Sequence, residues 1–304
     1  MTTLDLPRRV TVVEVGPRDG LQNEAVRVPT AVKVAFVEAL AAAGLPAVEI
    51  TAFVNPSRVP QMADAGEVAR GVARREGVRY TALVPNMRGL AAARQAGLTE
   101  VAVFAAASET LSRRNINQAI DESLAAYRDV VAEARRSGMR VRGYLSAAFG
   151  CPFEGEVAVP AVADLAARLL DLGVFEVAVS DTIGVATPGQ VIEVVEAVAA
   201  RVPREAIALH FHDTRGTALA NVLAALQAGI TTFDASAGGL GGCPFAPGAA
   251  GNVATEDLLY MLHGLGIETG VELDAVAAAS RAVARALNHP LASRYVAAGP
   301  ARPA

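Results

Sequence analysis

The sequence is poor in the residues that mark several classes of protein. Its 304 residues contain no tryptophan, four histidines and two cysteines, Cys151 and Cys243. Two distant cysteines do not make a disulfide framework, so we expect a reducing cytoplasm. The formal net charge is −4, which provides no basic surface for nucleic acid. No apolar run reaches membrane-spanning length and neither end resembles a targeting signal, so we also expect no membrane association.

What the chain does contain is a regular alternation of short β-branched runs and longer helical runs. The predicted strands cover residues 10–15, 47–53, 79–84, 100–106, 140–146, 175–180, 207–212 and 231–236. The predicted helices cover 30–43, part of 63–76, 86–96, 121–137, 160–172, 187–201, 217–228 and 255–265, and most are followed by glycine. Eight such units in this length favour an α/β fold, a closed (β/α)8 TIM barrel, over an open doubly wound sheet.

The turn after the first predicted strand agrees with a barrel. Residues 16–20 lack the Gly-x-Gly-x-x-Gly spacing of a dinucleotide-binding sheet. Residues 272–287 predict one extra helix outside the barrel, and a tail is expected from residue 288 onward. We therefore expect a single catalytic barrel domain over residues 1–304, in which 272–304 form a C-terminal helical extension and tail.

Two histidines stand two residues apart at the end of the seventh predicted strand. Side chains alternate between the faces of a strand, so His210 and His212 should point the same way, next to Asp213. Two imidazoles on one face can bind one metal ion, and oxygen donors extend the choice to Mg²⁺ or Mn²⁺. Asp19 is the obvious third ligand. The alternatives are one buried, hydrogen-bonded histidine beside an incidental one, and a turn role for Asp19.

Other polar residues follow other predicted strands, where the active site of a barrel is expected. Arg18 has the chemistry to stabilise a developing oxyanion, although a surface role is equally open. Asp181 suits either a general base or the cap of a short turn. Glu49 lies on the second predicted strand, and Asn86 follows the third. Charged groups on several strands at one end of a barrel favour an enzyme.

Cys243 stands in a loop with six glycines between residues 238 and 251. A thiol has a reference pKa of about 8.5, so it can donate or accept a proton. A glycine-rich loop over a barrel mouth also suggests a lid. The alternative is that Cys243 is a small buried residue. Cys151 has no comparable setting, and we expect it to be structural.

Three motifs together resemble the 3-hydroxy-3-methylglutaryl-CoA lyase family. They are Val-Glu-Val-Gly-Pro-Arg-Asp-Gly-Leu-Gln-Asn-Glu at 13–24, His-Phe-His-Asp-Thr-Arg-Gly at 210–216 and Gly-Leu-Gly-Gly-Cys-Pro at 239–244. The resemblance extends from about residue 10 to residue 287. Arg-Asp-Gly and His-x-His are shared with isopropylmalate and homocitrate synthases and with pyruvate carboxylase-type transferases. The longer first and third motifs are far more specific to the lyases.

The resemblance implies a (β/α)8 barrel, usually a homodimer, that binds a divalent metal cation, Mg²⁺ or Mn²⁺. The metal ligands of the family fall on Asp19, His210, His212 and Asn252, so that Asn252 comes from the resemblance alone. Its functional residues fall on Arg18, Glu49, Asp181, Cys243 and Glu256, and each of them matches.

The implied reaction is the cleavage of 3-hydroxy-3-methylglutaryl-CoA, an acyl-CoA, to acetyl-CoA and acetoacetate. Asp181 is the first candidate for the base that removes the proton of the tertiary hydroxyl, which metal chelation acidifies. Arg18 would bind and stabilise the acetyl-CoA enolate, and Cys243 would protonate its carbon. Glu49 and Glu256 would orient ligands or tune these acids.

Other functions stay open at this point. A sister lyase acting on a longer 3-hydroxy-3-alkylglutaryl-CoA would keep every catalytic residue and differ in pocket volume. A synthase is disfavoured because such enzymes usually carry an additional domain and lack the cysteine loop. A non-catalytic barrel that binds an acyl-CoA or a metal would have no need of Arg18, Asp19, His210, His212 and Cys243 together.

Overall fold

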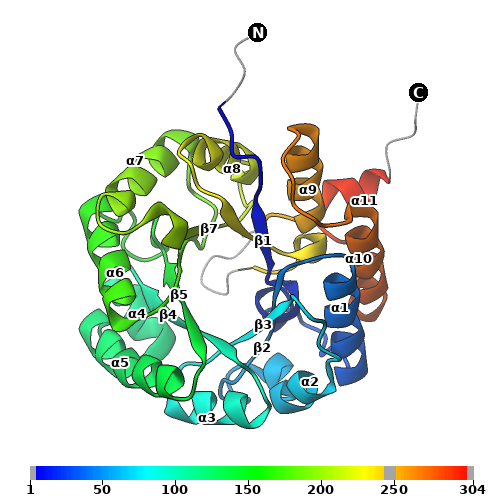
Figure 1. The fold of residues 1–304 in the computed structure, drawn as a ribbon, viewed down its shortest axis with the longest axis horizontal. Helices are drawn as coiled ribbons and strands as arrows, with labels where there is room; N and C mark the ends of the chain where they lie inside the picture. The colour runs from blue at the N-terminus through cyan, green and yellow to red at the C-terminus, as the bar shows by residue number, and fades with distance from the viewer. Residues whose placement is uncertain (1–4, 243–250, 300–304) are drawn as a thin grey trace.

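The protein forms a closed barrel of parallel strands surrounded by helices (Figure 1). The computed structural model describes residues 5–242 and 251–299. The strands are β1 (Thr11–Glu14), β2 (Ala47–Ala52), β3 (Arg79–Leu83), β4 (Glu100–Ala106), β5 (Arg140–Ser146), β6 (Val177–Asp181), β7 (Ile207–Phe211) and β8 (Thr232–Ala235). They pair in this order, and β8 pairs in parallel with β1 to close the barrel. The predicted (β/α)8 TIM barrel is confirmed.

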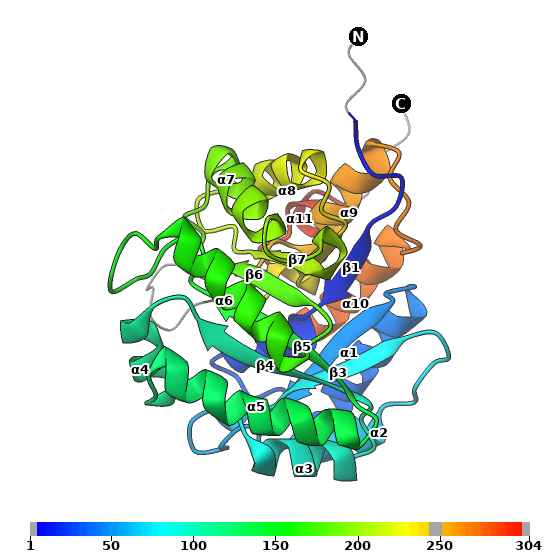
Figure 2. The same cartoon turned by 60° about the vertical axis from the view of Figure 1, so that its left-hand side comes forward.

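Helices follow the strands in turn and cover the outside of the barrel (Figures 1 and 2). They are α1 (Thr30–Ala42), α2 (Ala65–Gly71), α3 (Met87–Gln95), α4 (Glu109–Ile116), α5 (Ile120–Arg136), α6 (Val159–Leu172), α7 (Pro188–Ala199), α8 (Ala218–Gln227), α9 (Thr255–Gly264), α10 (Leu273–Leu287) and α11 (Arg294–Ala298). The expected extra helix is α10, which packs against α1 and α9. None of the helices in the described part of the chain has the length and apolar character needed to span a membrane.

Two helices were not predicted, and one strand was misplaced. Helix α4 is short and strongly charged, and it begins where the Ser108 hydroxyl accepts a hydrogen bond from Leu111 N at 3.1 Å. It shows no apolar periodicity long enough to be recognised. Strand β6 begins at Val177 rather than at residue 175 and extends to Asp181. Asp181 is therefore the last residue of the strand.

The expected C-terminal tail contains helix α11, which is fastened to α9. The Asp257 carboxylate accepts hydrogen bonds from the backbone N–H groups of Arg294 (3.0 Å) and Tyr295 (2.7 Å). The Ser293 hydroxyl caps the helix by accepting a hydrogen bond from Val296 N at 3.2 Å. These bonds are polar, and those to Asp257 join residues far apart in the sequence, so no hydrophobic pattern predicted the helix.

One buried carboxylate joins the carboxyl ends of β1 and β8. Glu14 accepts hydrogen bonds from the N–H groups of Gly16 and Ala237, both at 2.8 Å, and from the Thr255 hydroxyl at 2.7 Å. Burial nevertheless raises the pKa of Glu14 to about 7. The three donors hold the turn after β1 against the turn after β8. The turn after β1 carries Arg18 and Asp19, so Glu14 helps to place the candidate site.

Candidate metal centre and active site

A single π-helical turn, Gly16–Gly20, places Arg18 and Asp19 at the carboxyl end of β1. The Val15 carbonyl accepts hydrogen bonds from the N–H groups of Arg18 (3.1 Å), Asp19 (2.7 Å) and Gly20 (3.2 Å). A Cβ on Gly20 would lie 2.9 Å from the Leu240 side chain, so the close packing of this turn requires glycine there. The turn directs both polar side chains into the barrel, where they are buried. Arg18 is therefore not the surface arginine that the sequence left open.

Asp19 lies beside His210 and His212 at the carboxyl end of β7. His210 is in the strand and His212 follows it, and their ring centroids are 5.3 Å apart on the same side, as the alternation predicted. One potential ligand atom from each of Asp19, His210 and His212 lies within 4.8 Å of the other two. All three side chains are buried. The structure therefore brings the three sequence-derived ligand candidates into one cluster.

The protonation states in this cluster suit a cation. Burial, followed by the nearby His210, lowers the pKa of His212 to about 4, so its imidazole is neutral at pH 7. Burial raises the pKa of Asp19, but Arg18 and both histidines outweigh it and lower that pKa to about 2. A neutral imidazole and an ionised carboxylate are the forms that metals bind.

Asn252 completes the cluster from the segment that follows β8. Its side-chain N–H group donates to Asp19 Oδ2 at 2.9 Å and to the Leu240 carbonyl at 3.0 Å. Its Oδ1 and His212 Nδ1 are both buried without a hydrogen-bond partner in the described ranges 5–242 and 251–299. Buried polar atoms without a partner are rare. Such an amide oxygen, together with a carboxylate and imidazoles, fits a divalent cation such as Mg²⁺ or Mn²⁺.

His210 is oriented by residues that the sequence reading missed. Its Nδ1 lies 3.2 Å from Asp234 Oδ2, and that carboxylate also accepts two hydrogen bonds from Arg142, at 2.8 and 3.1 Å. Arg142 donates in turn to Glu176 at 2.7 Å. Because Asp234 engages Nδ1, the Nε2 atom of His210 is left for a ligand. His210 and Asp234 are register partners on β7 and β8, so the pairing of these two strands brings them together.

Arg18 is held by carboxylates on two sides. Its Nε donates to Glu49 Oε2 at 2.5 Å and its Nη1 donates to Asp19 Oδ1 at 2.6 Å, while its Cζ lies 5.4 Å from the centroid of the Tyr144 ring. Burial raises the pKa of Glu49 although Arg18 opposes that rise. The second oxygen of Glu49, Oε1, is buried without a partner in the described parts of the chain. Arg18 thus stands beside Asp19, His210 and His212 in a fixed orientation.

Asp181 caps the short turn that follows β6, which was one of the two roles expected for it. Its two oxygens accept hydrogen bonds from the N–H groups of Val185 (3.0 Å) and Ala186 (2.9 Å). Burial raises the pKa of Asp181, although these two hydrogen bonds lower it in part. A carboxylate with a raised pKa is better matched to proton transfer near neutral pH than an exposed one. The cap and the proposed base role are therefore compatible.

The other sequence-derived candidates lie around this centre. Glu256 accepts hydrogen bonds from Gly238 N, at 3.0 Å to each oxygen, and from the Ser280 hydroxyl, so it fastens the turn after β8 to α10. Cys243 lies outside the described residues. Cys151 is buried, with its sulfur 2.9 Å from the Ser108 hydroxyl, in keeping with a structural role.

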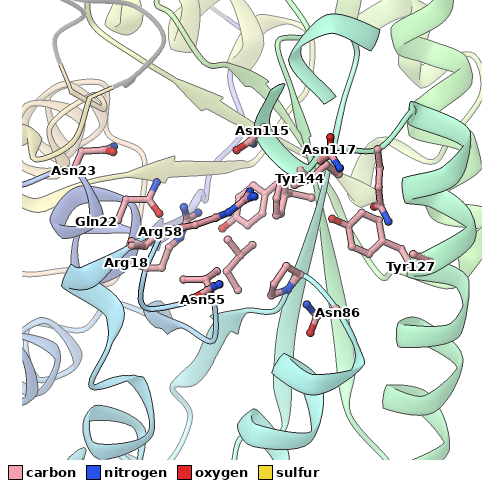
Figure 3. A pocket seen from close by; sticks show the side chains of 18 residues that line it. Arg18, Gln22, Asn23, Asn55, Arg58, Asn86, Asn115, Asn117, Tyr127 and Tyr144 are labelled. Atoms are coloured by element: carbon pink, nitrogen blue, oxygen red, sulfur yellow. The ribbon is translucent and has the colours of Figure 1, made fainter. Parts of the chain in front are cut away.

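A cavity of about 770 Å³ opens beside Arg18 (Figure 3). Its walls come from the segments that follow β1 and β2, from the carboxyl ends of β3, β4 and β5, and from α4 and α5. The polar lining side chains are Arg18, Gln22, Asn23, Asn55, Arg58, Asn86, Asn115, Asn117, Gln118, Tyr127 and Tyr144. Asn86 also caps α3 by accepting a hydrogen bond from Gly89 N at 3.0 Å. The cavity offers a polar, amide-rich approach to Arg18.

Comparison with known proteins gives a consistent result. The chain is 54% identical over 289 residues to the cytoplasmic 3-hydroxy-3-methylglutaryl-CoA lyase of Danio rerio, covering 95% of this chain and 86% of that protein. The solved HMG-CoA lyase of Bacillus subtilis is 49% identical, with a TM-score of 0.95 and coverage of 96% and 98%. An HMG-CoA lyase of Acinetobacter baumannii, solved with coenzyme A and 3-methylmalate, is 39% identical, with a TM-score of 0.92 and coverage of 96% and 95%.

The family model described as HMGL-like matches residues 9–283, which is most of the chain. This agrees with the resemblance carried by the three sequence motifs and with the barrel that the structure shows. The protein therefore belongs to the HMGL-like family.

Proposed function

We propose that this protein is a hydroxymethylglutaryl-CoA lyase, a carbon–carbon lyase that cleaves 3-hydroxy-3-methylglutaryl-CoA to acetyl-CoA and acetoacetate. The observation that carries the proposal is the convergence of Asp19, His210 and His212 beside the fixed guanidinium of Arg18. The names of relatives about 50% identical over nearly the whole chain support the same activity. The presence of coenzyme A in the related Acinetobacter structure supports an acyl-CoA substrate.

The cation would be held by Asp19, His210, His212 and Asn252. When bound, it supplies Lewis acidity that lowers the pKa of the substrate's tertiary hydroxyl. Asp181 accepts the hydroxyl proton as that oxygen becomes a ketone. The adjacent C–C bond breaks, and its electron pair passes into the thioester as an enolate. Cys243 then returns a proton to the enolate carbon, which yields acetyl-CoA and acetoacetate.

Arg18 is suited to stabilise the enolate because the guanidinium is already held in place. Glu49 and Asp19 hold the guanidinium before substrate arrives, so little reorganisation is needed when charge develops on the enolate oxygen. Glu49 positions Arg18 in this scheme, and Glu256 positions the turn that leads towards residue 243. Neither of these two glutamates reacts with the substrate.

Two further properties remain proposals. A homodimer rests on the family resemblance, and sedimentation velocity tests it. A cytoplasmic location rests on the low cysteine content and on the name of the Danio rerio relative, and cell fractionation tests it.

The first prediction concerns the reaction and its metal. Purified protein should release acetoacetate and acetyl-CoA in equal amounts from 3-hydroxy-3-methylglutaryl-CoA. Exhaustive chelation should abolish the release, and Mg²⁺ or Mn²⁺ should restore it, because the donor set fits such cations. No product from metal-loaded protein would contradict the lyase and favour a non-catalytic barrel. A higher kcat/KM for a longer 3-hydroxy-3-alkylglutaryl-CoA would assign the sister reaction instead.

The second prediction concerns the two proton transfers. Asp181→Asn and Cys243→Ser should each lower kcat by about 10²–10⁴-fold, because an amide is no base and a hydroxyl is a far weaker acid than a thiol. Metal content and thermal stability are measured alongside. Cys151→Ser is the matched control and should stay near wild type. Near-wild-type kcat in Cys243→Ser would remove the thiol as proton donor, and in Asp181→Asn would move the base to another residue.

The third prediction concerns Arg18. Replacement by methionine keeps most of the side-chain volume but removes the positive charge at the enolate oxygen. Arg18→Met should lower kcat by about 10²–10³-fold while the metal content stays unchanged. Arg88→Met, an exposed arginine on α3, serves as the control. A rise in KM with kcat unchanged would show that Arg18 binds the substrate uniformly and does not stabilise the transition state.

A further inference from the structure

The loop between β2 and α2 presents one arginine to the cavity from an ordered turn. The Asn55 carbonyl accepts hydrogen bonds from Arg58 N at 2.9 Å and Val59 N at 3.1 Å. The Asn55 side chain also accepts a hydrogen bond from Ser57 N at 3.0 Å. This Asx turn fixes the backbone that carries Arg58, so the exposed side chain starts from a defined point at the cavity.

The far end of the same loop is fastened to α1 by a buried ion pair. Lys33 Nζ donates to Asp64 Oδ1 at 2.7 Å and to the Gln61 carbonyl, and the Thr30 hydroxyl donates to Asp64 Oδ2 at 2.7 Å. Lys33 and Asp64 are only 2% and 5% exposed, so solvent screens their attraction weakly. The loop is therefore anchored on both sides of Arg58.

The positive charge of Arg58 has no acidic partner on the cavity wall. Among the residues that the structure describes, two arginines line the cavity and no acidic side chain does. Arg18 is compensated by Glu49 and Asp19, which contact it from outside the lining. The Arg58 guanidinium makes no hydrogen bond or ion pair within residues 5–242 and 251–299. Figure 3 shows Arg58 and Arg18 among the side chains around the same cavity.

The arginines of a smaller cavity at the amino ends of the strands are compensated, whereas Arg70 and Arg88, which line a neighbouring cavity between β2 and α3, make no hydrogen bond or ion pair within the described residues. In the smaller cavity, Arg79 and Arg140 both contact the Glu100 carboxylate, at 3.2 and 3.6 Å. Arg74 in the same cavity donates to the backbone carbonyls of Ala69, Ala96 and Gly97. Arg58 differs because it combines an anchored backbone, an uncompensated charge and a place in the cavity that leads to Arg18.

We propose that Arg58 binds an anionic group of the CoA thioester and so contributes to substrate affinity. A guanidinium offers a planar fork of donors that suits both phosphate and carboxylate oxygens. The substrate carries both, as the phosphates of the nucleotide and as the free carboxylate of the acyl group. This inference rests on the proposed function and adds a substrate-binding residue that acts through charge.

The test compares Arg58→Met with wild type in binding and in turnover. CoA has the phosphates but no acyl carboxylate. If Arg58 binds phosphate, calorimetry with CoA should show about tenfold weaker binding in Arg58→Met and a shallower salt dependence of binding. Arg58→Lys should recover part of the affinity because it keeps the charge. Arg281→Met, an exposed arginine on α10 away from the cavity lining, should bind CoA as wild type does.

The second arm uses the 3-hydroxy-3-methylglutaryl thioester of pantetheine, which has the carboxylate but no nucleotide phosphates. If Arg58 binds phosphate, Arg58→Met raises KM for the CoA thioester alone. If it binds the carboxylate, KM rises about tenfold for both thioesters and CoA binding is unchanged. Unchanged CoA binding together with unchanged KM for both thioesters would overturn the proposal. Failure of the lyase itself is separate, because wild-type protein would then release no acetoacetate.

Discussion

The buried ion pairs of Arg18 are the interaction on which the candidate site depends. One guanidinium joins Glu49 on β2 to Asp19 after β1, with all three groups removed from solvent. Removing a carboxylate from water is unfavourable unless it is paired, so Arg18 is what allows Asp19 to stay ionised beside the histidines. The attraction is mutual, because the two carboxylates fix a guanidinium that would otherwise move freely. The same contacts thus hold in place both the proposed metal ligand, Asp19, and the proposed oxyanion-stabilising group, Arg18.

A second network supports the opposite side of the cluster. Arg142 on β5 reaches across the barrel interior to Asp234 on β8, and Asp234 orients His210 on β7. Arg142 also donates to the Tyr144 hydroxyl at 3.1 Å, and Tyr144 lies on the cavity wall beside Arg18. The two networks therefore meet at Tyr144. Barrel closure gives them their geometry, since β8 lies between β7 and β1 only when the sheet is closed.

Local sequence patterns were enough for the barrel and for part of the site. The period of two along a strand placed His210 and His212 on one side, and the turn after β1 suggested Asp19. Asn252 needed the family resemblance, because it follows a long glycine-rich loop whose path no local pattern reveals. Asp234 and Arg142 were missed because their partners lie on other strands, where spacing along the chain carries no information. Arg58 was missed because its significance lies in what is absent around it, the lack of an acidic neighbour on the cavity wall.

The central proposal is that Asp19, His210, His212 and Asn252 hold one divalent cation. The most direct measurement is pulsed electron paramagnetic resonance on the Mn²⁺-loaded protein, with and without ¹⁵N-labelled histidine. The account predicts couplings from two histidine nitrogens, which change on labelling and fall to one nitrogen in His212→Ala. A spectrum of fully hydrated Mn²⁺ without histidine coupling, in protein that is folded and active, would contradict the account.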